Sequence, residues 1–568
     1  MGSKKILFLY PNHKGMTMLP PGISLLSAVL KREGFVVDLF DTTQYDSVEI
    51  DGEKNSKDHN KTLENKLSVR PAPEHKKVVV KYTNVFEDFR KKVISFGPDL
   101  IAMSTTEDMF TLGIALLKKI KDLKILTLAG GIFPSMVPNL VLSFEEIDMV
   151  CKGEGEAALP LLCRKLEKKE NYDDVTNLYI KKKNGDIKAN RIDMICKGEG
   201  EAALPLLCRK LEKKENYDDV TNLYIKKKNG DIKTNPIGMI NMDENPLIDV
   251  RLFEESRFYR PMSGKVYKMF PVETHRGCPY KCSFCNSPDT MEMYKTEAGT
   301  NYLRHKSFEN MRKELIFYKN EMKAEYLYFW ADTFFSWSQR DLETFADIYA
   351  DIKLPFWCQT RPETITKKRI EIVQKMGLDK MSLGVEHGNY EFRKKYIDRQ
   401  MPNYVVTDAM NLLYDMGVGT TCNNIIGFPY ETRKLAFDTI RLNRTFRATD
   451  RTVQAFTPFH GTPLKKLTDK LGFTKPTDIQ RSFSTVGSQM DMPQFRKKEI
   501  NGLVKTFNMY CRFPESRWNE IQKAEEDSPE GNKIYESLKK EFMDKYWNKS
   551  ISFEQAAAEN DPHATLPT

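Results

Sequence analysis

Apolar strand-like segments alternate with helical segments in two blocks of the chain, and this alternation limits the possible folds more than any other feature. Strands separated by helices require right-handed crossovers, which build a parallel sheet with helices on both faces. The first block therefore predicts a doubly wound, Rossmann-like α/β domain over residues 1–146, with its last strand just beyond. Its strands are expected at 5–10, 35–40, 99–104, 124–129 and 147–151.

The second block predicts a partial (β/α)6 TIM-like barrel over residues 246–480. In barrels of this kind, polar residues at the carboxyl ends of the strands line the site. Residues 481–568 predict a small helical region that caps the barrel, followed by a disordered tail from Ala556. The six barrel strands are expected near 270–274, 326–333, 356–361, 380–386, 421–427 and 453–459.

Two unusual segments interrupt these blocks. Residues 46–76 are charged, have few apolar positions and predict a surface insertion. The region 147–245 contains a tandem duplication, in which 147–188 recurs as 192–233 with one substitution. Two copies are too few for a solenoid, which needs at least three repeats. Only one copy can supply the fifth strand, so the other is expected to form an addition or to be disordered.

Three closely spaced cysteines lie in the loop that opens the second block. Cys278, Cys282 and Cys285 follow a C-x3-C-x2-C pattern. Three thiolates suit either zinc or an iron–sulfur cluster. A structural zinc ion needs a fourth ligand. His275 stands only three residues before Cys278, and this short spacing makes it difficult for His275 to bind the same ion as the cysteines. A four-iron cluster held by three cysteines keeps one iron open for a small molecule.

Composition indicates the setting in which the chain works. Ten cysteines in 568 residues do not suggest a disulfide scaffold, so a reducing cytoplasmic location is expected. No apolar run reaches the length of a membrane span, and residues 6–10 are too few for a signal-peptide core. The net charge of +9 is spread along the chain, which is typical of a solvated surface and disfavours nucleic acid as a partner.

The cysteine pattern, with an aromatic residue before the last cysteine, resembles that of the radical S-adenosylmethionine (SAM) enzymes. In that family the open iron of a [4Fe-4S] cluster binds the amino and carboxylate groups of SAM. The resemblance implies that Cys278, Cys282 and Cys285 are the cluster ligands and catalytic residues. It also implies SAM contacts, matched in chain order to the strand ends, from Phe284, Asp332, Thr333, Arg361, Glu386, Gly427 and Pro429.

The first block resembles the cobalamin-binding domain that precedes many radical SAM barrels. The likeness lies in Pro-Pro-Gly before the first helix, Gly-Gly after the fourth strand and Gly-Glu-Gly-Glu after the fifth. Many cobalamin proteins also use Asp-x-His-x-x-Gly for an axial histidine, and the sequence has no such motif. The cobalt is therefore expected to lack a histidine ligand, and His13 is expected to be a solvated loop residue. The implied cobalamin contacts are Ser104, Thr105, Gly130, Gly131, Gly153 and Glu154.

Together these resemblances imply a cobalamin-dependent radical SAM enzyme that methylates an unactivated carbon of a small molecule or natural-product intermediate. An external flavodoxin- or ferredoxin-like protein would supply the electron for cleavage of SAM to a 5′-deoxyadenosyl radical, and cobalamin would carry the methyl group. Three alternatives stay open. They are a radical cyclase or rearrangement enzyme on the same scaffold, an RNA methylthiolating enzyme, and a non-catalytic cobalamin or iron–sulfur sensor.

Overall fold

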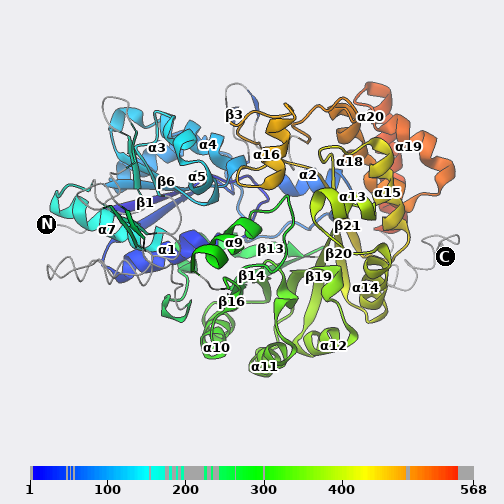
Figure 1. Cartoon of the computed structure of the whole chain (residues 1–568), viewed down its shortest axis with the longest axis horizontal. Coiled ribbons are helices and arrows are strands. Elements are labelled where there is room, and N and C mark those ends of the chain that lie inside the picture. Colours follow the sequence, from blue (N-terminus) through cyan, green and yellow to red (C-terminus); the bar gives the residue numbers. More distant parts are fainter. Residues whose placement is uncertain are drawn as a thin grey trace. The chain divides into compact units, whose positions relative to one another are not determined.

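A computed structural model describes most of the chain, and the described residues form two compact units (Figure 1). Unit 1 contains Met1–Lys57, Lys76–Phe258 and Asp289–Ser307, and unit 2 contains Asp58–His75, Tyr259–Pro288 and Phe308–Thr568. The described residues are 4–46, 49–50, 53–54, 58–151, 155–172, 175, 178–181, 187–189, 194–196, 223–226, 232–234, 242–262, 264–298, 301–481 and 487–547.

Unit 1 is built on a seven-stranded sheet in the order β2-β1-β5-β6-β7-β8-β9. The first five of these strands are parallel, as predicted: β1 (Lys5–Tyr10), β2 (Val36–Asp41), β5 (Leu100–Ser104), β6 (Leu126–Gly130) and β7 (Met149–Cys151). The apolar side chains of β1 are buried on both faces, because helices cover both sides of a doubly wound sheet.

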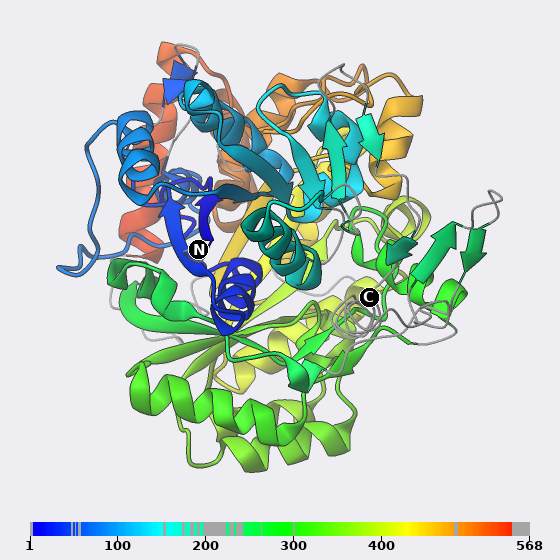
Figure 2. The same ribbon diagram turned by 90° about the vertical axis from the view of Figure 1, so that its left-hand side faces the viewer.

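Helices α1 (Pro21–Arg32) and α7 (Gly155–Lys168) lie on one side of this sheet, and α3 (Val85–Phe96) and α4 (Glu107–Lys118) lie on the other (Figures 1 and 2). Local signals set the ends of α3. The side chain of Asn84 accepts hydrogen bonds from the first-turn amides, and Gly97 ends the helix in the left-handed conformation. These observations confirm the predicted Rossmann-like domain. Its shorter helices are α5 (Ile132–Met136) and α6 (Pro138–Leu142).

The duplicated segments form the same strands in two different sheets. The first copy supplies β7 and then two antiparallel strands, β8 (Leu178–Lys181) and β9 (Ile187–Ala189), at the edge of the main sheet. The second copy forms a separate three-stranded sheet with an equivalent register. The second copy is thus an addition to the domain, one of the two outcomes expected. Its strands are β10 (Met194–Cys196), β11 (Leu223–Lys226) and β12 (Ile232–Thr234).

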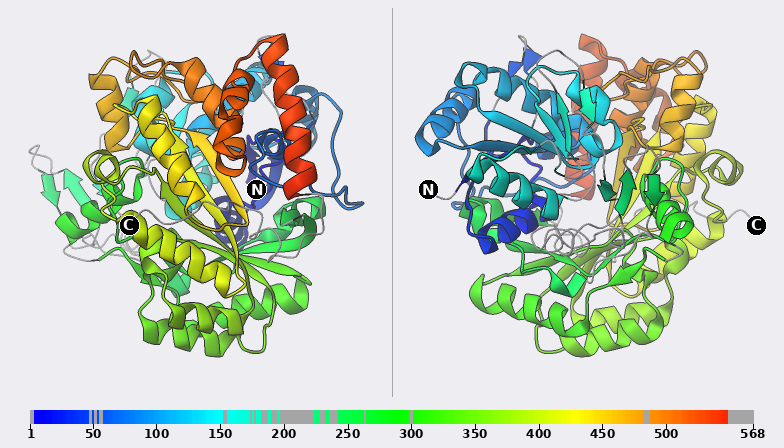
Figure 3. Two further views of the ribbon diagram at one scale, coloured as in Figure 1. Left: turned by 90° about the vertical axis from the view of Figure 1, so that its right-hand side faces the viewer. Right: turned by 60° about the vertical axis from the view of Figure 1, so that its left-hand side comes forward.

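Unit 2 contains a curved sheet whose six parallel strands confirm the predicted partial barrel (Figures 1 and 3). An additional strand, β13 (Tyr259–Met262), pairs antiparallel with the first of them. The parallel strands are β14 (Lys265–Glu273), β17 (Tyr326–Trp330), β18 (Phe356–Thr360), β19 (Leu378–Glu386), β20 (Gly419–Ile426) and β21 (Asp450–Ala455).

Helices connect these strands and cover the outer face of the sheet (Figure 3). Capping residues define their ends: Ser338 accepts a hydrogen bond from the Asp341 amide at the start of α11, and Gly377 ends α12 in the left-handed conformation. The barrel helices are α10 (Phe308–Ile316), α11 (Gln339–Tyr349), α12 (Lys367–Met376), α14 (Asn403–Asp415), α15 (Arg433–Arg444) and α16 (Pro463–Lys470).

The C-terminal helices form one apolar cluster with β20 and β21, and a segment from far earlier in the chain joins it. This segment follows α2 (His59–Asn65), and its Leu67 is 3% exposed within the cluster. The hydroxyl of Tyr535 donates to the Asn65 carbonyl. The prediction of a surface insertion is therefore wrong for residues 63–68, where Leu63, Leu67 and Ser68 are buried. The C-terminal helices are α18 (Lys497–Arg512), α19 (Trp518–Ala524) and α20 (Pro529–Tyr546).

None of the helices that the structure describes is long and apolar enough to cross a membrane.

Candidate active site and cofactor sites

The three cysteines lie in the loop after β14, at the carboxyl end of the barrel. Cys278, Cys282 and Cys285 are free thiols and each is half-buried. Burial raises the pKa of Cys278 and Cys282, and the positive charges of Arg399 and Arg361 oppose this rise at Cys282. A metal would bind the thiolates and displace their protons. The donor set therefore fits an iron–sulfur cluster.

Two neighbouring residues that follow β17, Asp332 and Thr333, contact the cysteine loop or the residue after it. The hydroxyl of Thr333, which is buried, lies 3.5 Å from Cys278 Sγ. Asp332 is exposed, and its Oδ2 accepts a hydrogen bond from the Ser287 hydroxyl at 3.0 Å. The Ser287 amide in turn donates to Cys285 Sγ at 3.5 Å. The end of β17 thus contacts both sides of the cysteine loop.

Arg361 lies at the end of β18 and contacts the loop directly. Its Nη1 donates a hydrogen bond to Cys282 Sγ at 3.0 Å. Its guanidinium group lies over the ring of Tyr280, 3.7 Å from the ring centroid. Glu363 binds the other edge of the guanidinium group. Its Oε1 lies 2.7 Å from Arg361 Nε and 2.5 Å from Arg361 Nη2. The side chain is 9% exposed, so this arrangement is a built part of the site.

Glu386 ends β19 in the left-handed region, with φ of 67°. A non-glycine residue in this region is strained, and such strain gathers at functional sites. Its Oε1 accepts from Arg399 Nη1 at 2.7 Å, and Arg399 Nη2 also donates to the Gly384 carbonyl at 2.6 Å. Burial raises the pKa of Glu386, while Arg399 and Arg361 oppose the rise. This carboxylate is thus held at the end of its strand by a buried arginine.

The turn after β20 is organised by a carboxylate that sequence reasoning missed. Glu431 is fully buried, and its Oε2 accepts from the amides of Gly427 at 2.6 Å and Phe428 at 2.9 Å. Its Oε1 lies 3.1 Å from Nε2 of the buried His387. Gly427 has a φ of 94°, which explains why glycine stands there. A signal was present, because a Glu stands only four residues after this glycine.

Phe284 connects the cysteine loop to this turn. The centroid of its half-buried ring lies 6.2 Å from that of the Phe428 ring. Pro429, which follows Phe428 in the chain, is buried. The backbone of Ser283 adds two hydrogen bonds, from its amide to the Ile397 carbonyl and from the Leu464 amide to its carbonyl. The predicted SAM residues on the loop and on the turn are therefore gathered in one region of unit 2.

The structure also bears on the alternative of a zinc site. His275 is buried, and both ring nitrogens are engaged, Nδ1 with the Thr274 hydroxyl at 3.0 Å and Nε2 with the Ser336 hydroxyl at 2.9 Å. It is therefore not available as a fourth ligand.

The aromatic residues that follow β17 do not face a substrate space. Phe334, Phe335 and Trp337 are 0%, 2% and 5% exposed. The Trp337 ring stacks on Phe345 at 5.5 Å. These aromatics therefore pack in the core of unit 2. His460 donates a hydrogen bond from its Nε2 to the Pro476 carbonyl, 2.8 Å away.

The predicted cobalamin contacts of unit 1 lie at the carboxyl ends of β5 and β6. Ser104 pairs with Gly130 across the two strands, and the Thr105 amide donates to the Gly130 carbonyl at 3.0 Å. Gly131 has a φ of 102°, and a Cβ there would lie 2.6 Å from the Thr105 carbonyl oxygen. Backbone is therefore exposed where two strand ends meet. Gly153 and Glu154 lie outside the described residues.

The loop after β1 lies at the same carboxyl edge of the sheet. His13 is 6% exposed, so its interpretation as a solvated residue is wrong. The reason is the neighbouring Asn12, whose side chain donates to Thr43 Oγ1 at 2.9 Å and to the Met16 carbonyl at 2.8 Å, which holds the loop against the end of β2. Burial lowers the pKa of His13 to about 4, so its ring is neutral at physiological pH.

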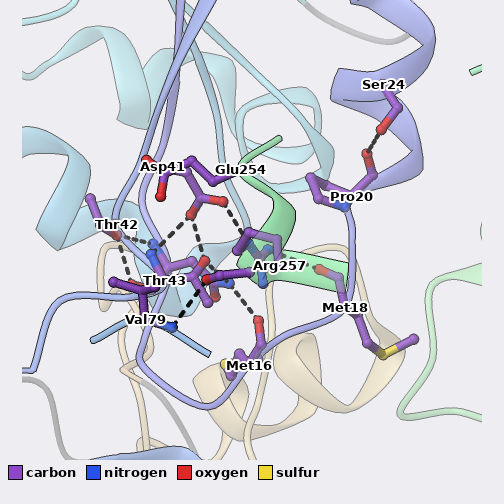
Figure 4. Close-up of polar contacts among 12 residues, drawn as sticks. Met16, Met18, Pro20, Ser24, Asp41, Thr42, Thr43, Val79, Glu254 and Arg257 are labelled. Carbon is purple, nitrogen blue, oxygen red and sulfur yellow. Dashed lines mark hydrogen bonds and ion pairs between the residues drawn. The ribbon is translucent and has the colours of Figure 1, made fainter. Parts of the chain in front are cut away.

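Arg257 joins this loop to β2, as Figure 4 shows. Its Nε donates to Asp41 Oδ2 at 2.7 Å and its Nη2 to the Met18 carbonyl at 3.2 Å. Two buried nitrogens here, Arg257 Nη1 and His13 Nδ1, have no hydrogen-bond partner among the described residues. Such atoms are rare in folded proteins and call for an explanation. A bound molecule with polar groups at this edge would supply one.

Comparisons with known proteins agree with this architecture. Residues 272–442 match the radical SAM superfamily. An uncharacterized methyltransferase from Pyrococcus horikoshii is 25% identical over 431 residues, which are 74% of this chain and 80% of that protein. An oxygen-independent coproporphyrinogen III oxidase from Helicobacter pylori is 26% identical over 207 residues, which are 34% of this chain and 42% of that protein.

Two solved structures share the fold over most of the chain. The radical SAM methyltransferase TsrM from Kitasatospora setae has 13% identity and a TM-score of 0.54, over 83% of this chain and 77% of that one. The cobalamin-dependent SAM radical enzyme OxsB has 14% identity and a TM-score of 0.54, over 95% of this chain and 71% of that one. Residues 272–442 therefore match the radical SAM superfamily, and the chain shares the fold of these two structures over most of its length.

Proposed function

We propose that the chain is a cobalamin-dependent radical SAM enzyme that methylates an unactivated carbon of a small molecule. The observation that carries the proposal is the cysteine loop, where Cys278 lies beside Thr333, Cys282 lies beside Arg361, and the ring of Phe284 faces Phe428 of the turn at Gly427. Bound there, a [4Fe-4S] cluster would supply the electron that cleaves SAM. Support for methyl transfer comes from the relatives described as methyltransferases.

The protein residues would bind and orient SAM rather than carry out the chemistry themselves. Carboxylates such as Asp332 can hold the amino group or ribose hydroxyls, and the turn at Gly427 with Phe284 can bind the adenine. Glu386 stays at its strand end because Arg399 holds it. Residue by residue, these roles are proposals that follow the matched positions in the family.

The edge of unit 1 fits a large ligand such as cobalamin. Gly131 lets the ends of β5 and β6 approach each other closely, because a Cβ there would meet the Thr105 backbone. Beside this edge, His13 Nδ1 and Arg257 Nη1 are buried and lack hydrogen-bond partners among the described residues. The solved structures with this fold include TsrM with cobalamin and a [4Fe-4S] cluster bound. Cobalamin would supply the carrier for a methyl group, and its cobalt is still predicted to lack a histidine ligand.

An external electron donor of the flavodoxin or ferredoxin type would be needed, because reduction of the cluster takes one electron from outside the chain. We place the enzyme in the cytoplasm, since free thiols and a labile cluster require a reducing compartment. The substrate is a small molecule in this proposal, and a natural-product intermediate is its expected class.

Anaerobic reconstitution tests the two cofactor sites directly. The protein is treated with iron, sulfide and hydroxocobalamin, passed through a desalting column, and assayed for iron, sulfide and cobalt. The proposal predicts about four irons and one cobalamin per chain. Retention of a single zinc ion in place of iron, or no retained cobalamin, would contradict it.

Substitution of Gly131 by Ala is expected to abolish retention of hydroxocobalamin. The added Cβ would lie 2.6 Å from the Thr105 carbonyl, and φ of 102° is strained for any L side chain. The strain should cost about 1–3 kcal/mol of folding free energy, which a shift in thermal unfolding would measure. The matched control is Gly97→Ala at the end of α3, because Gly97 also has a positive φ, of 62°, while a Cβ there would meet nothing within 4 Å. If both variants kept cobalamin equally well, the site would lie elsewhere.

A further inference from the structure

The guanidinium of Arg361 is engaged on three sides, two of them by residues of the cysteine loop. Glu363 takes Nε and Nη2, Cys282 takes Nη1, and Tyr280 covers a face of the group. An arginine has five N–H donors in a fixed fork. The edge formed by Nη1 and Nη2, which would grip a carboxylate in bidentate fashion, is thus divided between a sulfur atom and Glu363.

This commitment places a permanent positive charge against one cluster ligand. Arginine stays protonated, and a hydrogen bond from a charged donor to a thiolate is stronger than one between neutral groups. The site is only 9% exposed at Arg361, so water screens the charge weakly. Hydrogen bonds to the sulfur ligands are among the factors that set the potential of an iron–sulfur cluster.

We propose that Arg361 is a positioning residue that acts through Cys282 to raise the reduction potential of the cluster, rather than a ligand of the SAM carboxylate. When the cluster takes one electron from an external donor, its negative charge increases by one unit. A fixed positive charge and a donated hydrogen bond at Cys282 Sγ stabilise this reduced state more than the oxidised state. This inference rests on the proposed cluster.

Redox titration of the reconstituted protein, followed by electron paramagnetic resonance of the reduced cluster, tests the inference. Arg361→Gln removes the charge and is expected to shift the reduction equilibrium at least tenfold toward the oxidised cluster, about 59 mV downward for a one-electron couple. Arg361→Lys keeps the positive charge but replaces the guanidinium group with a single ammonium group. It is expected to give a potential between those of Arg361→Gln and the wild-type protein. The SAM dissociation constant is measured on the same samples.

The matched control is Arg369→Gln in α12. Arg369 is a half-buried arginine that donates to the Phe335 and Trp337 carbonyls. Among the described residues it forms no hydrogen bond with a cysteine, so its substitution should leave the potential unchanged. An unchanged potential in Arg361→Gln would overturn the inference, above all if SAM binding were weakened instead. If Arg361→Gln lost its cluster, the inference would be tested on Arg361→Lys. A lowered potential in that variant would support the inference, and a wild-type potential would overturn it. A wild-type protein without a cluster would refute the proposed function, and the inference with it.

Discussion

Replacing Cys282 with Ala is expected to remove SAM cleavage completely, with no 5′-deoxyadenosine above background. A [4Fe-4S] cluster that keeps one open iron has only three protein ligands, so the loss of one leaves the cluster incomplete. Cys282 is half-buried and contacts Arg361, and its side chain is outside the apolar core cluster of the unit. The fold should therefore survive. The measurement is product formation after anaerobic reconstitution, with circular dichroism to check the fold.

Cys358→Ala provides the matched control for this result. Cys358 is a free cysteine buried in β18, at 0% exposure, and its burial raises the pKa of the thiol so that it stays protonated. Its loss should cost about 1 kcal/mol of stability and leave iron content and SAM cleavage near wild type. Retained cleavage in Cys282→Ala would be incompatible with the assigned cluster ligands.

Replacing Glu431 with Ala is expected to have the largest effect on stability. The change would leave the Gly427 and Phe428 amides and the His387 imidazole without their acceptor, all of them buried. Each buried polar group that loses its partner costs about 1–3 kcal/mol, so a total of about 3–9 kcal/mol is expected for the three groups. Since domains are stable by about 5–15 kcal/mol, the midpoint of thermal unfolding should fall steeply.

An exposed glutamate serves as the control. The Glu309 side chain is 78% exposed and pairs with Lys313 along α10, so Glu309→Ala should change stability by less than about 0.5 kcal/mol. A second variant, Glu431→Gln, keeps one acceptor oxygen and should lie between Glu431→Ala and wild type. If Glu431→Ala had the same midpoint of thermal unfolding as the wild-type protein, this carboxylate would not be what stabilises the turn at Gly427.

The strands of both sheets could be predicted because each is a short apolar run between helices. Residues 326–329 illustrate this, since all four are buried in β17. The cysteine loop was equally visible, because its spacing is local. By contrast, residues 58–75 contain few apolar positions, and the docking of Leu67 against helices more than 400 residues later left no local pattern.

The polar interior of the site was harder to predict for the same reason. Glu431 is charged and follows a turn, so sequence alone places it on the surface. Its burial depends on the Gly427 and Phe428 amides and on His387, which come from two different strand ends. His13 was misplaced because its burial follows from the bonds of Asn12 to the end of β2. Such contacts arise from the tertiary fold.

The most direct test of the account is a single mass-spectrometry assay of the reconstituted protein with SAM, hydroxocobalamin and a strong reductant. The account predicts that 5′-deoxyadenosine and S-adenosylhomocysteine both form, because SAM serves as radical source and as methyl donor. Formation of 5′-deoxyadenosine alone would contradict methyl transfer and favour a cyclase or rearrangement enzyme. The absence of both products, from protein with a verified cluster, would contradict catalysis by this chain.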